Sequence, residues 1–220
     1  MAGQRVTGDF YDSLRVSPER VLFGLLDLAG LREGNSAILA AVQETFRGLG
    51  TELFSKPDIN ESDSMTELSL DINRNLIEVS EGVHSCPAFL ACYHEKFGTL
   101  CYANAGHTPA LLRDGKGIVE LTPTGLPLGL FSHATVDAPI IGLGADAALL
   151  LVSRGVVERG SDSHDPGSEF GLGRVKEALR HAPVDHAQAL CASILDTAEK
   201  FSPAAPFCGD LTALALVRTV

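Results

Sequence analysis

The chain has 220 residues, 45% hydrophobic and 20% charged, which suits a single globular domain with a sizeable core. Its net charge of −11, without any cluster of Lys or Arg, argues against a nucleic-acid or anionic-membrane partner, because both require local positive charge. No apolar run approaches the roughly 18 residues of a membrane span, and no signal-peptide core follows Met1. We therefore expect no membrane insertion and a cytoplasmic location.

The first half of the chain predicts two strands and then two helices. The strands are expected at 5–11 and 20–27, joined by a short polar turn. Apolar residues recur at helical spacing over 35–53 and 64–79, which predicts two amphipathic helices there.

The second half predicts mostly strands, because apolar runs of strand length alternate with glycine-containing turns. The expected strands lie at 88–94, 99–104, 110–113, 118–121, 135–140, 147–152 and 211–217. Helices are expected at about 172–179 and 185–201. Helices set between runs of antiparallel-type strands indicate one α+β layered domain over residues 1–220, which a longer signalling protein could carry behind upstream sensor domains.

Five cysteines, an odd number without a C-x-x-C pair, argue against a disulfide framework. Cys92, His94 and Cys101 could meet across a hairpin and hold zinc. The alternative, which we favour, is that the thiols are small buried side chains beside a surface histidine.

Four segments that lie far apart in the sequence can each deliver one residue to a shared acidic site. The first contains Asp9 and Asp12, and the second is a strand that ends at Asp27. The third and fourth deliver Arg154 and Gly209, which are not acids. The site therefore contains only half of the carboxylates that such an arrangement could supply.

Six motifs in a fixed order carry a resemblance to a known family. They are GDFYD, YANAGHTPALL, PTGLPLGLF, LLLVSRGVVE, FGLGRV and GDLTALALVR, with the strand of Asp27 after the first. Along nearly its whole length the chain resembles the bacterial SpoIIE-like branch of the metal-dependent protein phosphatases (PPM, or type-2C-like). The resemblance implies two stacked, mainly antiparallel β-sheets flanked by helix pairs, an αββα sandwich, with a dinuclear Mn²⁺ or Mg²⁺ site at one edge.

The resemblance also implies roles for individual residues in the hydrolysis of phosphoserine or phosphothreonine on proteins. Asp27 corresponds to the acid that bridges the two ions, and the Leu28 backbone carbonyl corresponds to a main-chain ligand. Asp9 corresponds to an acid that supports the second ion, directly or through water. Such hard cations prefer oxygen ligands, and a bridged pair can generate a hydroxide for in-line attack. For Asp12 we favour a structural turn over a ligand role.

The chain departs from the family pattern at several points. Arg154 stands where the family usually has the Asp of Asp-Gly, and Gly209 stands where its last acid is usual. Asp210 would become a ligand only after a one-residue register change, which turns a side chain to the opposite face of a strand. The loop after Asp27 is about two residues longer than in the family and lacks the family's basic residue. His107 does not take the place of that residue and is expected in a turn. We expect one weakly held Mn²⁺ or Mg²⁺ ion, or none.

Arg154 could take the place of a metal. Two carboxylates about 4–5 Å apart repel by several kcal/mol at an effective dielectric constant near 20. A guanidinium group could cancel that repulsion through forked hydrogen bonds to Asp9 and Asp27. The alternative is that Arg154 points into solvent, as most arginines do.

Three functions are compatible with this sequence. The residues favour a pseudophosphatase that binds a small phosphorylatable regulatory protein, of the kind represented by anti-sigma-factor antagonists, with weak or no turnover. The alternatives are an active Mn- or Mg-dependent phosphoserine phosphatase that acts on such a protein, and a structural relay domain. The sequence leaves the oligomeric state open, a homodimer included.

Overall fold

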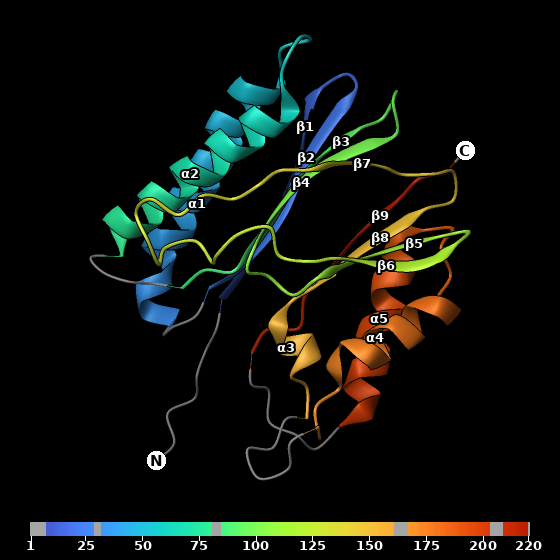
Figure 1. Cartoon of the computed structure of the whole chain (residues 1–220). Helices are drawn as coiled ribbons and strands as arrows, with labels where there is room; N and C mark the ends of the chain where they lie inside the picture. Colours follow the sequence, from blue (N-terminus) through green and yellow to red (C-terminus); the bar gives the residue numbers. More distant parts are fainter. Residues whose placement is uncertain (1–7, 29–31, 81–84, 161–166, 203–208, 220) are drawn as a thin grey trace. The chain divides into compact units, whose positions relative to one another are not determined.

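The computed structural model describes most of the chain, and Figure 1 shows its course. The described residues are 8–28, 32–80, 85–160, 167–202 and 209–219, with only the backbone described at 32–36. They form two compact units. We call Gly8–His107 with Thr122–Leu143 the N-terminal unit, and Thr108–Leu121 with Gly144–Val220 the C-terminal unit. No helix in the described ranges is long and apolar enough to span a membrane.

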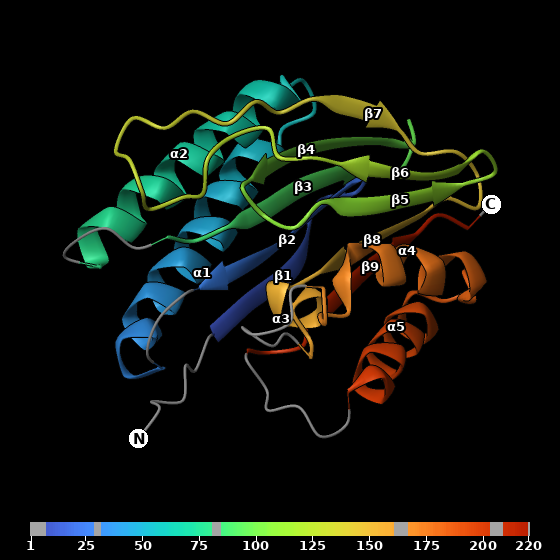
Figure 2. The ribbon, with the colours of Figure 1, turned by 60° about the horizontal axis from the view of Figure 1, so that its bottom comes forward.

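The N-terminal unit is a five-stranded antiparallel sheet with a helix pair on one face. In sheet order its strands are β1 (Gly8–Ser17), β2 (Arg20–Leu28), β3 (Ala88–His94), β4 (Thr99–Ala105) and β7 (Ile140–Gly142). The helices are α1 (Arg32–Phe54) and α2 (Glu61–Val79), which lie side by side in Figure 2. Their apolar faces, with Phe46 and Ile72 fully buried, pack on strand residues such as Leu22 and Leu90.

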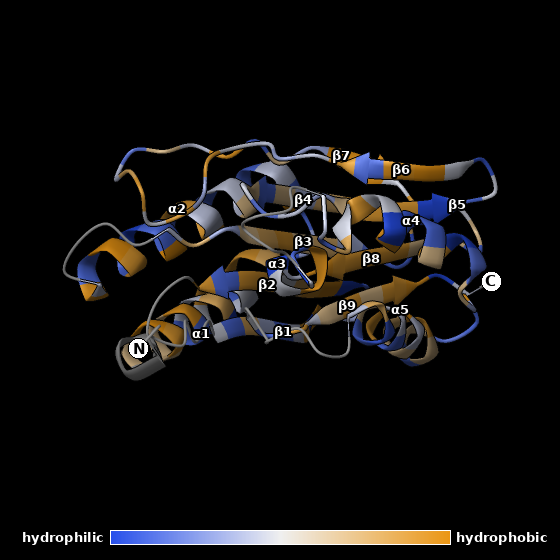
Figure 3. Cartoon of the chain, turned by 90° about the horizontal axis from the view of Figure 1, so that it is seen from below, coloured by the Kyte–Doolittle hydropathy of each residue, from blue (hydrophilic) through white to orange (hydrophobic). Residues whose placement is uncertain are grey.

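The C-terminal unit repeats the scheme with a four-stranded antiparallel sheet. In sheet order its strands are β6 (Gly117–Leu121), β5 (Ala110–Asp114), β8 (Ala148–Val152) and β9 (Ala213–Val217). The helices are α3 (Arg154–Val157), α4 (Gly171–His181) and α5 (Ala187–Phe201). The strands are mainly apolar in Figure 3, whereas α4 and α5 alternate between polar and apolar faces. The core joins Leu150 of β8 to Leu179 of α4 and Ile194 of α5.

The predicted fold class is confirmed: an α+β protein with two mainly antiparallel sheets, each accompanied by a helix pair. Some boundaries were wrong. Helix α2 begins at Glu61 rather than at 64, because the Asn60 side chain accepts hydrogen bonds from the main-chain N–H groups of Ser62 and Asp63 and caps the helix. The strand expected at 135–140 is absent there except for a bridge at Val136, and β7 begins only at Ile140.

A buried ion pair joins the helix pair to the sheet. Arg20, at the start of β2, donates from Nε to Glu61 Oε1 at 2.7 Å, and both side chains are less than one-tenth exposed. Its two remaining nitrogens donate to the main-chain oxygens of Lys56 and Pro57 at 2.9 and 3.2 Å. One guanidinium group therefore fixes the connection between α1 and α2 against the sheet. Of its three acceptors, Glu61 alone carries a negative charge, because the other two are main-chain carbonyl oxygens.

We expect Glu61→Gln to lower the free energy of unfolding by about 3 kcal/mol, because it leaves a buried guanidinium group without a counter-charge. Urea denaturation of the purified chain measures the loss. Glu95→Gln is the matched control: Arg15 and Glu95 are paired at 2.7 Å but are about half exposed, so this change should leave stability nearly unaltered. Equal effects of the two substitutions would contradict this role of the buried pair.

Candidate functional site

Strands β1 and β2 place two candidate acids directly opposite each other. Asp9 and Asp27 are register partners in the antiparallel ladder. Side chains of such partners share one face of the sheet with Cβ atoms about 5 Å apart, where two negative charges repel by about 3 kcal/mol at an effective dielectric constant near 20. Asp27 is only 4% exposed and Asp9 is half-buried, so water screens this repulsion incompletely. The pair is therefore a site that favours a cation.

The surroundings of Asp27 fix its strand and limit its possible ligands. Its main-chain N–H donates to the carbonyl of Pro87 at 2.9 Å, and Leu28 beside it is fully buried. The neighbouring thiol of Cys86 is fully buried, and burial together with the Asp27 charge raises the pKa of that thiol far above its usual range. In these surroundings Cys86 is a neutral, buried thiol.

The donors near this pair fit one hard cation better than two. Asp9, Asp27 and the Leu28 carbonyl would give one Mn²⁺ or Mg²⁺ ion three oxygen ligands, and water would supply the rest. Within the part of the chain that the structure describes, no three His, Cys, Asp or Glu side chains converge closely enough to hold a metal ion.

The turn role predicted for Asp12 is wrong. Asp12 lies in the middle of β1, opposite Gly24, because this strand continues to Ser17 rather than ending near Tyr11. Its carboxylate accepts hydrogen bonds from Arg47 Nε at 2.6 Å and Nη2 at 3.1 Å, which joins β1 to α1. Successive strand residues alternate between faces, so Asp12 and Asp9 lie on opposite faces of the sheet. Asp12 is a structural ion-pair partner.

In the C-terminal unit, the two segments that lack the expected acids come together. Arg154 begins α3 directly after β8, with its side chain 45% exposed and its Nε 3.9 Å from Glu158 Oε1. The buried Ser153 hydroxyl donates to the carbonyl oxygen of Asp210 at 2.9 Å and accepts from the main-chain N–H of Thr212 at 3.1 Å. One hydroxyl thus ties the segment of Gly209 and Asp210 to the end of β8.

Gly155 makes this approach possible. A Cβ atom at position 155 would overlap the main-chain oxygen of Asp210 and lie 3.2 Å from the carbonyl carbon of Gly209. The glycine of the Arg154-Gly155 dipeptide is therefore required for close packing, independently of any ligand at position 154. The packing of this segment at the end of β8 therefore does not depend on an acid at position 154 or 209.

The turn expected at His107 is confirmed. Its main-chain N–H donates to Asn104 Oδ1 at 2.8 Å, and Gly106 before it has a φ of +68°, which favours glycine. The zinc alternative finds no support. Cys92 and Cys101 are buried register partners, and burial raises the pKa of the Cys101 thiol to about 12. The thiols are core side chains, as predicted, but His94 is only 2% exposed, so the prediction of a surface histidine beside them is wrong.

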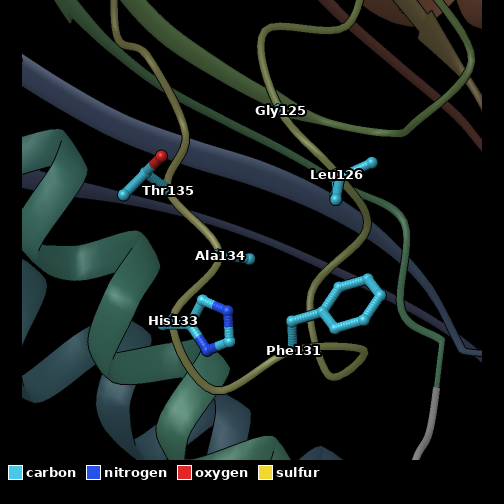
Figure 4. Close-up of a pocket in the computed structure, with 6 residues that line it drawn as sticks. All are labelled: Gly125, Leu126, Phe131, His133, Ala134 and Thr135. Atoms are coloured by element: carbon cyan, nitrogen blue, oxygen red, sulfur yellow. The ribbon is translucent and has the colours of Figure 1, made fainter.

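One cavity was not anticipated from the sequence. It measures about 600 Å³ and lies in the segment between β6 and β7, where the motif PTGLPLGLF occurs. Figure 4 shows the residues that line it: Gly125, Leu126, Phe131, His133, Ala134 and Thr135. The only hint in the sequence was the concentration of apolar residues in a stretch that has the turn residues Gly and Pro.

Comparison with known proteins agrees with this fold and order of motifs. The family model described as Stage II sporulation protein E (SpoIIE) matches residues 17–219. The phosphoserine phosphatase RsbP of Bacillus subtilis is 25% identical over 158 residues, which are 71% of this chain and 38% of RsbP. The chain thus spans less than half the length of that relative.

Solved structures show the same fold at low sequence identity. The PP2C domain of SiaA from Pseudomonas aeruginosa superposes with a TM-score of 0.76 at 17% identity, over 95% of this chain and 80% of that one. The RsbU and RsbW domains of a Mycobacterium tuberculosis protein give a TM-score of 0.74 at 20% identity, over 100% of this chain and 58% of theirs.

We expect Gly155→Ala to lower the free energy of unfolding by about 2 kcal/mol, because the added methyl group must displace the segment of Asp210. Chemical denaturation measures this change. Gly173→Ala is the control in the same unit: Gly173 lies in α4, and a methyl group there meets no atom within 4 Å, so this change should stabilise slightly. If both variants are at least as stable as the parent chain, the close approach at Gly155 is not a constraint.

Proposed function

We propose that this chain, which belongs to the SpoIIE family, is a regulatory domain that binds a small phosphorylatable protein and has weak or no phosphatase turnover of its own. The observation that carries the proposal is the set of residues at the four family positions. Asp9 and Asp27 form an opposed pair in the N-terminal unit, whereas the corresponding positions of the C-terminal unit hold Arg154 and Gly209. Two-ion catalysis requires carboxylates from both sets.

The remaining acids would still give the domain some metal chemistry. Asp9, Asp27 and the Leu28 carbonyl would hold at most one Mn²⁺ or Mg²⁺ ion, and only weakly; when bound, this ion would supply a Lewis acid and an activated water. Without a second ion, nothing clamps the leaving oxygen and the attacking oxygen together, so we expect phosphoester hydrolysis to be slow. Binding of a phosphorylated partner needs less, because one cation suffices to attract a phosphoryl group.

An active phosphoserine phosphatase that acts on an anti-sigma-factor antagonist is the second candidate. The observation in its favour is that Asp9 and Asp27 are opposed in the ladder, where two carboxylates favour a cation. The similarity to RsbP, which is itself named a phosphoserine phosphatase, points the same way. Metal binding and turnover separate the two candidates.

We expect calorimetric titration of the parent chain with Mn²⁺ to give little heat, and its hydrolysis of p-nitrophenyl phosphate to be close to background. The double variant Arg154→Asp with Gly209→Asp restores the missing carboxylates and should gain Mn²⁺ affinity. Adding Asp27→Asn to the double variant should remove that gain. Micromolar Mn²⁺ binding together with clear turnover in the parent chain would refute the proposal in favour of an active enzyme.

Arg154 is proposed as the counter-charge that replaces a metal at the Asp9–Asp27 pair. If so, Arg154→Ala leaves the carboxylates to repel each other and should lower the melting temperature of the metal-free chain by about 3 °C. The control is Arg180→Ala, because Arg180 lies on the exposed face of α4 and its ion pair with Glu177 is also exposed. If Arg154→Ala and the parent chain have the same melting temperature, Arg154 does not replace a metal ion at the Asp9–Asp27 pair.

A further inference from the structure

The segment 122–139, which we call the strap, connects β6 to β7 through irregular backbone whose two arms are held together. Gly125 and Val136 form an antiparallel bridge, and the Thr124 hydroxyl donates to the carbonyl oxygen of Asp137 at 2.7 Å. A Cβ atom on Gly125 would lie 2.8 Å from the main-chain oxygen of Thr135, so glycine is required for the arms to approach this closely. The strap is therefore a defined loop with a fixed spacing.

Helix α2 fixes the strap from one side. Asn73 is fully buried, donates from Nδ2 to the carbonyl oxygen of Phe131 at 2.9 Å, and accepts from the main-chain N–H of Gly129 at 2.7 Å. The Ser62 hydroxyl, on the same helical face, donates to the carbonyl oxygen of Ala138 at 2.6 Å. Both the turn and the returning arm are thus held before any partner arrives, which reduces the entropy lost on binding.

The cavity between the arms, which we call the slot, is apolar and open to solvent. Leu126 on one arm and Phe131 near the turn both line it and are 54% and 50% exposed, so two large apolar side chains meet solvent at one opening. No carboxylate, Lys or Arg lines it, and His133 is its only ionisable group. At about 600 Å³ the slot is large enough for an aromatic ring, and the rings of Phe131 and His133 (Figure 4) offer aromatic contacts.

The part of α2 next to the strap is acidic. One face of α2 contacts the strap, and the face next to it is exposed. Helical periodicity places three acids, Asp63, Glu67 and Glu78, and one base, Arg74, on that exposed face. The helix that holds the strap therefore presents net negative charge to solvent on the face next to it. Complementarity favours an apolar anchor that is flanked by Lys or Arg, and it disfavours a second copy of this chain, whose net charge is −11.

We infer that the slot docks an aromatic side chain carried in a basic segment of a partner protein. Preformed pockets that bury an aromatic anchor at the centre of a polar rim carry most of the affinity in protein interfaces. The inference goes beyond the proposed function and needs neither a metal ion nor turnover, so either can fail without the other.

The test uses the absence of tryptophan from the chain, which leaves the fluorescence of a tryptophan probe free of protein background. The peptides Ac-Lys-Trp-Lys-NH2 and Ac-Glu-Trp-Glu-NH2 are titrated with the full chain in metal-free buffer. We expect the emission of the lysine peptide to shift to the blue, with association at least about fivefold tighter than that of the glutamate peptide at low salt. The difference should shrink in concentrated salt, because surface charges are then screened.

Substitutions locate the binding. Phe131→Ala should weaken association of the lysine peptide about tenfold, and Ala134→Leu, which fills the slot, should do the same. Phe97→Ala is the matched control, because Phe97 is 67% exposed in the same unit but does not line the slot. No emission shift with the parent chain, or equal losses from Phe131→Ala and Phe97→Ala, would overturn the inference. So would sedimentation showing a dimer that Phe131→Ala dissociates.

Discussion

The opposition of Asp9 and Asp27 across one antiparallel ladder is the constraint around which the candidate site is built. Two carboxylates on one face of a sheet, one of them almost fully buried, raise the energy of the fold unless a cation lies nearby. A metal-dependent enzyme meets this need with an ion, and Arg154 is our proposed substitute. In our proposal, the identity of that cation decides whether the domain hydrolyses a phosphoester or only binds the phosphorylated protein.

In the C-terminal unit, the main-chain packing at the end of β8 is independent of the side chains at positions 154 and 209. Ser153 and Gly155 still hold the segment of Asp210 at the end of β8, as a working site would require. Packing constraints of this kind persist after chemistry is lost, because a misplaced methyl group costs stability whether or not a metal binds. A domain with little turnover can therefore keep the shape that its partner recognises.

The sequence predicted the class of fold and the strand of Asp27 because apolar runs of strand length are a local signal. It failed for Asp12, where a preference for turns yielded to a strand that continues past it and to pairing with Arg47. It also failed for the strap, whose main chain is bonded by α2 side chains such as Asn73, 56 positions from Gly129. Interactions across such separations leave no local pattern, so the slot could not be predicted.

Strand β1 has a further property, because it is the outermost strand of its sheet. No described strand pairs with its outer side, and such an edge can recruit a strand from another molecule. A bulge between Arg15 and Ser17 interrupts it, and Asp9, Asp12 and Arg15 bring charge to it. These are the devices that natural sheets use against aggregation. The charge of Asp9 therefore opposes edge-to-edge association whether or not the domain hydrolyses a phosphoester.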